Sequence, residues 1–87
     1  MIIAIYARYN KLEEETFGTM ESAKDFLNVI EENGQGFAIG IYNSETKEAF
    51  ITIQKIGFDD SALLNIKMND LKRLGYDVKR TIALDFD

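Results

Sequence analysis

The segment GFAIGIYNSETKEAFITIQ, residues 36–54, contains two apolar runs on either side of a polar turn. In residues 36–42 and again in residues 48–54, side chains alternate with a period of two, which is typical of β-strands. Asn43 begins the polar segment between the runs, and its side chain can hydrogen-bond the backbone that follows. The segment therefore predicts a β-hairpin with a loop of four or five residues.

A helix is predicted before this hairpin, over residues 20–32. Thr19 is a suitable N-cap, and Asn33-Gly34 is expected to end the helix in the left-handed conformation. The apolar residues of the segment recur with helical spacing and form one stripe. These residues are Met20, Ala23, Phe26, Leu27 and Ile30.

Less regular patterns mark the remaining elements. Residues 2–9 are almost all apolar and predict a buried strand, and residues 13–17 follow it as a loop or as a short extra strand. A second helix begins at Asp59 or Asp60, or else later with Asn69 as its cap. Gly75 is expected to end this helix.

With a last strand over residues 76–86, the element order becomes β-α-β-β-α-β, in a single domain of residues 1–87. This order is that of ferredoxin-like proteins. We therefore predict an α+β, ferredoxin-like two-layer sandwich, in which two helices cover one face of a four-stranded antiparallel sheet and residues 13–17 add a short strand. The strand residues expected beneath the helices are Ile3, Ile5, Ala7, Phe37, Ile39, Ile41, Ala49, Ile51, Ile53, Val78, Ile82 and Leu84.

The opposite face of this predicted sheet has no helix above it and carries several aromatic residues. By alternation, Tyr6, Tyr42 and Phe50 lie on that face with small residues between them. A monomer seldom exposes such a patch, so the aromatic residues are candidate protein-binding residues for another protein or for a second copy of the chain. Ordinary, singly exposed aromatic residues are the alternative explanation.

Two charge clusters are further candidates for binding. The acidic run of Glu13, Glu14 and Glu15 is either a solvated loop or a contact for a basic partner. A basic region near the second helix and the last strand is either dipole-stabilised and solvated or a site for an anionic partner. Its residues are Lys72, Arg73, Lys79 and Arg80.

The composition excludes several kinds of chemistry. The chain has no cysteine and no histidine, so it cannot contain a cysteine-based metal site or a catalytic Ser-His or Cys-His pair. The net charge of −5 argues against a general nucleic-acid binder, and residues 48–53 lack the basic-glycine start of an RNA-recognition motif. No membrane span is expected, and without a signal segment or cysteines we expect a cytoplasmic protein.

Together, these patterns predict a small non-enzymatic interaction module of the accessory or inhibitor type. It is expected to bind a protein partner through the open sheet face, the acidic loop or both, with no catalytic residues, metal or cofactor. The alternative is an ACT-like domain that senses a small ligand, or a purely structural homodimeric domain.

Overall fold

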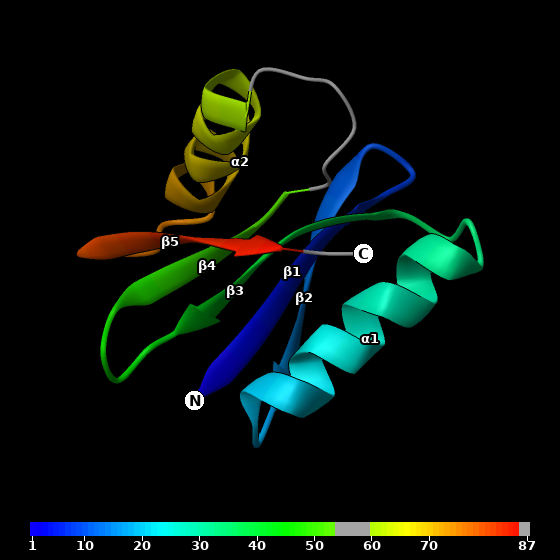
Figure 1. Ribbon diagram of the computed structural model, residues 1–87, viewed down its shortest axis with the longest axis horizontal. Helices are drawn as coiled ribbons and strands as arrows, with labels where there is room; N and C mark the ends of the chain where they lie inside the picture. The colour runs from blue at the N-terminus through cyan, green and yellow to red at the C-terminus, as the bar shows by residue number, and fades with distance from the viewer. Residues whose placement is uncertain (54–59, 86–87) are drawn as a thin grey trace.

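A computed structural model describes residues 1–53 and 60–85, and within these residues the chain forms two helices and one five-stranded mixed sheet (Figure 1). In chain order the elements are β1 (Ile2–Arg8), β2 (Lys11–Phe17), α1 (Met20–Glu32), β3 (Phe37–Asn43), β4 (Glu48–Ile53), α2 (Asp60–Arg73) and β5 (Arg80–Asp85). The extra strand is therefore present and begins earlier than predicted. Neither of the helices described is both long and apolar enough to cross a membrane.

The predicted caps of α1 are confirmed. The Ser22 backbone N–H donates to the Thr19 hydroxyl oxygen at 3.1 Å, which satisfies one of the free donors of the first turn. Gly34 has a φ of 64°, and the Gln35 N–H donates to the Ile30 carbonyl oxygen at 2.9 Å. The helix thus ends where glycine permits the left-handed conformation.

The predicted turn between β3 and β4 is also confirmed. The Asn43 side-chain oxygen accepts hydrogen bonds from the backbone N–H groups of Glu45 at 2.9 Å and Thr46 at 3.3 Å. Lys47 completes the loop with a φ of 60°. An asparagine at the start of the loop therefore fixes the hairpin.

Of the two predicted starts for the second helix, the structure has the earlier one. α2 begins at Asp60 and not near Asn69, while Asp59 lies outside the described residues. Gly75, with a φ of 88°, ends the helix as predicted. The last strand begins at Arg80 and is shorter than residues 76–86, of which residue 86 is also outside the described part.

The sheet differs from the ferredoxin-like prediction in strand number, order and direction. The strand order is β2-β1-β3-β4-β5, and the first four strands in this order are antiparallel to one another where they pair. The last strand, β5, is parallel to β4. The prediction of four antiparallel strands was therefore wrong, whereas the α+β class is correct.

The two helices lie on opposite faces of the sheet and not on one face (Figure 1). The crossover through α1 joins the parallel strands β2 and β3, and the crossover through α2 joins β4 and β5. Both crossovers step in the same direction across the sheet, but β2 and β4 point in opposite directions. Because such crossovers have a single preferred hand, the two helices must then cover opposite faces.

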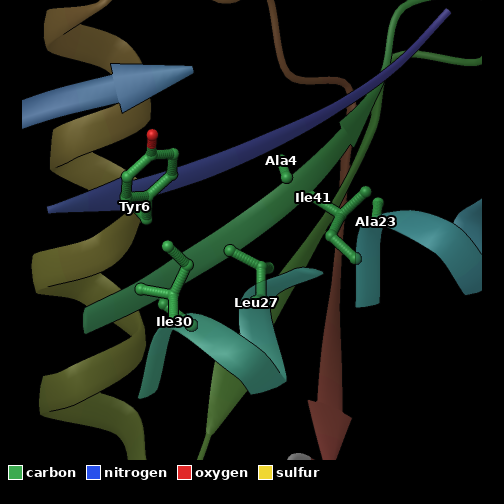
Figure 2. Close-up of a cluster of buried hydrophobic side chains, with 7 residues drawn as sticks. Ala4, Tyr6, Ala23, Leu27, Ile30 and Ile41 are labelled. Atoms are coloured by element: carbon green, nitrogen blue, oxygen red, sulfur yellow. The ribbon is translucent and has the colours of Figure 1, made fainter. Parts of the chain in front are cut away.

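Each helix packs on its own hydrophobic cluster. On the α1 side, Ala23, Leu27 and Ile30 contact strand residues that include Ala4 and Tyr6 (Figure 2). On the α2 side, Leu71 packs in a separate cluster that contains Ile5, Ile39, Tyr42, Ala49 and Ile51. The sheet is thus the central layer of a three-layer arrangement, with apolar side chains on both faces.

A β-bulge in β3 changes the alternation that the sequence predicted. Ile5 of β1 pairs with Gly40, but Tyr6 pairs with Ala38, so Ile39 is an additional residue in β3. Consequently Ile39 lies on the α2 side and Ile41 on the α1 side, although alternation placed both on one face. Three other residues of the predicted inner face also differ: Phe37 is exposed, Leu84 packs on the α1 side, and Ile82 pairs with Phe50 on that side.

Candidate protein-binding surface at the end of the sheet

The open aromatic face predicted from the sequence is absent, because a helix lies on each side of the sheet. Tyr6 and Tyr42 are each only 5% exposed, and they lie on opposite faces. Phe50 is half-buried on the α1 side. The three aromatic side chains therefore do not form one surface.

Both buried tyrosines are held by specific contacts. The Tyr6 ring packs edge-on against Phe26, with centroids 5.3 Å apart, and burial together with a hydrogen bond to Glu13 raises the pKa of its hydroxyl. The Tyr42 hydroxyl donates to the Asp77 carbonyl oxygen at 2.6 Å, and its ring lies 4.7 Å from that of Tyr76. These contacts account for both side chains as parts of the fold.

The acidic run forms the edge strand β2 and not a loop. Alternation along β2 places Glu13 and Glu15 on the α1 side, where they lie opposite Tyr6 and Ala4 of β1. Glu14 lies on the α2 side, opposite Ile5. Glu14 accepts a hydrogen bond from the Tyr76 hydroxyl, and both Glu14 and Glu15 are exposed. The edge of the sheet is therefore strongly acidic on both sides.

The predicted basic region is present, but ion pairs neutralise part of its charge. Arg73 lies 3.7 Å from Asp70, and Arg80 lies 3.6 Å from Glu48. Lys72 is exposed at the end of α2, and Lys79 is exposed just before β5. The region thus keeps two exposed lysines beside two local salt bridges, each of which contributes little to stability in water.

The turn between β1 and β2 has an unusual backbone. Tyr9 and Asn10 have φ values of 50° and 62°, which is the left-handed pattern of a two-residue hairpin turn. Asparagine and glycine adopt this conformation readily, whereas a bulky side chain does so at a cost of about 1 kcal/mol or more. Tyr9 is therefore held in a conformation that its own side chain disfavours.

The Tyr9 ring gains little from the fold in return. It is 83% exposed, and the guanidinium carbon of Arg8 lies 5.2 Å from its centroid. Phe37, the first residue of β3, is 73% exposed. Two large aromatic side chains thus face solvent at the same end of the sheet.

A cavity of about 470 Å³ lies between these two aromatic residues on the α1 side of the turn. Its lining comes from the ends of β1, α1 and β3: Ala7, Tyr9, Asn10, Glu31, Gly34, Gln35, Gly36 and Phe37. We call Tyr9, Phe37 and this cavity the turn surface. It combines exposed aromatic rings with a concave floor, as at the anchor positions of many protein interfaces.

A second cavity lies on the α2 side of the same turn, with a volume of about 580 Å³. Lys11 and Arg73 provide basic groups in its lining, and Asp70 provides an acidic group. Ala7 and Asn10 line both cavities, so the turn projects between them. A partner that contacts the tip of this hairpin would meet hollows on both sides.

Sequence reasoning missed the turn surface. Residues 2–9 were interpreted as one strand, which placed Tyr9 inside it, and Phe37 was assigned to the inner face. The available signal was the pair Tyr9-Asn10 between two strand-like runs, because two residues in that position are typical of a hairpin. The tyrosine hid the signal, since asparagine or glycine is the usual first residue of such a turn.

Lys67 of α2 is half-buried, and its amine contacts the strand β4. Its Nζ donates to the Thr52 carbonyl oxygen at 2.5 Å and to the Thr52 hydroxyl oxygen at 3.1 Å. Burial lowers the pKa of the amine, and the nearby charge of Glu31 opposes that effect. The Thr52 hydroxyl also lies 3.0 Å from the Ala38 carbonyl oxygen, so this group links α2 to β4 and β3.

Among the described residues, no three acidic side chains come close enough together to hold a metal ion. Comparison of the chain with family models, with curated proteins and with solved structures finds no match. The turn surface is accordingly interpreted from its own geometry.

Proposed function

We propose that the chain is a protein-binding module without enzymatic activity, and that the turn surface is its main contact. The observation that carries this proposal is Tyr9, whose strained backbone and exposed ring are not explained by packing within the fold. Backbone strain of this kind is concentrated at functional positions. Phe37 on the other side of the cavity supplies a second aromatic anchor.

The chemistry of this end of the molecule describes the partner. Exposed aromatic rings bind into apolar pockets, so the partner should offer at least one such pocket. The neighbouring edge strand β2 carries Glu13, Glu14 and Glu15, and the chain as a whole has a net charge of −5. We therefore expect a partner whose basic side chains face β2, away from Lys11 and Arg73 beside the turn, which would also accelerate the encounter.

Affinity capture from an extract of the source cells tests the proposal with three forms of the chain. The wild type is compared with the double variant Tyr9→Ser/Phe37→Ser and with a matched control, Val29→Ser/Ile66→Ser. Val29 and Ile66 are also exposed apolar residues, at 50% and 59%, but they do not line the cavity. A partner of the turn surface is retained by the wild type and the control and is lost from the first variant.

The acidic strand is tested separately by replacing its three glutamates with glutamine. We expect this variant to bind the same partner with a slower association rate and a weaker dependence on salt.

If capture is unchanged by Tyr9→Ser/Phe37→Ser in a folded variant, the turn surface is not the contact and the proposal is wrong.

An ACT-like ligand-sensing domain was the alternative expected from the sequence, and it depended on a ferredoxin-like arrangement. The observed placement of the helices on opposite faces gives that alternative no support.

A further inference from the structure

The two edges of the sheet differ in chemistry. β2 forms one edge and β5 the other, and in the described part of the chain no strand lies beyond either. An edge strand offers unpaired backbone N–H and C=O groups to any strand that approaches, and proteins commonly block such edges with charged residues. β2 is blocked in this way by Lys11 and its three glutamates, whereas residues 81–84 of β5 are uncharged.

The α1-side face next to β5 is only partly covered. α1 packs mainly over β1, β2 and β3 and leaves the same face of β4 and β5 without a helix (Figure 1). Phe50 of β4 is directly opposite Ile82 of β5, and both are half-buried, as is Leu84. An apolar strip therefore reaches the open edge of the sheet.

We propose that β5 pairs with β5 of a second copy, in an antiparallel arrangement about a two-fold axis that passes beside Ile82. An axis perpendicular to the sheet keeps each residue on the same face in both copies. The half-buried Phe50, Ile82 and Leu84 of the two molecules then form one continuous apolar strip. The result is a ten-stranded sheet that continues through the interface, a recognised mode of strand addition.

The order of charges along the strand favours this self-pairing. With Ile82 opposite Ile82 of the second copy, the position of Lys79, just before β5, falls opposite the position of Asp85, at the end of β5, and the same pairing occurs twice because of the symmetry. Opposite charges in cross-strand positions stabilise a pair of strands. The equivalent pairing of β2 about its centre would place Glu14 opposite Glu14, and Glu13 opposite Glu15, which is repulsive.

Light scattering coupled to size-exclusion chromatography tests the proposal first. We expect the mass to rise with protein concentration from that of the 9.9 kDa chain toward about twice that value. A mass that stays at one chain throughout the accessible concentration range would overturn the proposal. This result is independent of the turn surface, which lies at the end of β1 and β3.

Charge exchange then tests the register. Asp85→Lys places a lysine opposite Lys79 at both ends of the paired strands, and this like-charge repulsion should raise the concentration at which the dimer forms. The double variant Lys79→Asp/Asp85→Lys restores opposite charges and should restore the dimer, with circular dichroism confirming that each variant is folded. Dimerisation that survives Asp85→Lys unchanged contradicts the proposed pairing.

A single cysteine gives a direct geometric test, because the chain contains no other cysteine. Residues directly opposite in an antiparallel pair have Cα atoms about 4.5–5.5 Å apart, within the span of a disulfide. Ile82→Cys should therefore form a covalent dimer on mild oxidation, whereas the control Glu14→Cys at the centre of β2 should not. Crosslinking at residue 14 and not at residue 82 would assign the interface to the other edge.

Discussion

Tyr9 occupies a backbone conformation that asparagine adopts at lower cost. We predict that Tyr9→Asn raises the free energy of unfolding, by up to about 1 kcal/mol, because the strain is relieved and the exposed ring contributes little packing. Urea denaturation measures this change, with Asn10→Ala as a control that should destabilise the same turn. If Tyr9→Asn destabilises the fold, the ring makes a contact that explains its position, and the argument for binding fails.

Tyr76 gives the fold a dependence on alkaline pH. Burial, followed by the hydrogen bond to Glu14, raises the pKa of its hydroxyl well above the ordinary value of 10.0. Below pH 10 the tyrosine is neutral in both folded and unfolded chains, and its contribution to stability is complete. Above pH 10 the unfolded chain loses the proton more readily, so stability falls as the pH rises.

Tyr76→Phe should reduce this alkaline loss of stability. We expect the variant to be slightly less stable at pH 8, because the hydrogen bond to Glu14 is lost, but to lose less of its unfolding free energy between pH 9 and pH 11. Part of the loss remains because burial also raises the pKa of Tyr6. Equal pH dependence in the two proteins would contradict the assignment.

The individual elements could largely be predicted from the sequence, because their signals are local. Helix α1, its caps and the Asn43 turn follow from spacing and from residues whose backbone preferences are strong. The covering of both sheet faces could also have been predicted. Residues 2–7 are continuously apolar, which is typical of a strand with a helix on each side, whereas alternation alone was used to assign an open face.

The β-bulge in β3 had no comparable signal. An extra residue at Ile39 reverses the facing of every residue after it, so the sequence pattern FAIGIY fits two different assignments. Only the pairing with β1 decides between them. For the same reason, the sequence could not show that Tyr6 and Tyr42 lie on opposite faces.

Gly40 is required where β3 approaches β4 closely. A Cβ atom at this position would lie 2.7 Å from the Phe50 carbonyl oxygen and 3.2 Å from Ile51 Cδ1. Because the first contact is to backbone, the strand itself would have to move, so Gly40→Ala should destabilise the fold by about 1–3 kcal/mol. Gly18→Ala is the matched control, since its Cβ meets nothing within 4 Å, and urea denaturation should show little change for it.

For the molecule as a whole, the position of the helices depends on the hand of the two crossovers. A stable fold with both helices on one face would bring α1 and α2 together, whereas the observed sheet separates their cores. The ferredoxin-like prediction failed because the order of elements does not define the order of strands. The parallel pairing of β5 with β4 is a long-range choice that no local pattern reports.

This separation predicts additive effects of mutations in the two cores. Leu27 and Leu71 are both fully buried, one beneath each helix. Leu27→Val and Leu71→Val should each cost about 1 kcal/mol, and the double variant should show the sum within about 0.5 kcal/mol, because the sites share no contacts. A clear departure from additivity, measured by denaturation, would indicate that the two cores are in contact.

The central claim is that the end of the sheet around Tyr9 and Phe37 contacts a protein partner. Photo-crosslinking tests it most directly, with benzoylphenylalanine placed at residue 9, 37 or 29 of the full chain in the source cells. The account predicts that residues 9 and 37 give the same crosslinked product and that residue 29, an exposed position on α1, gives none. The absence of any product from residues 9 and 37, or the same products from all three positions, would contradict it.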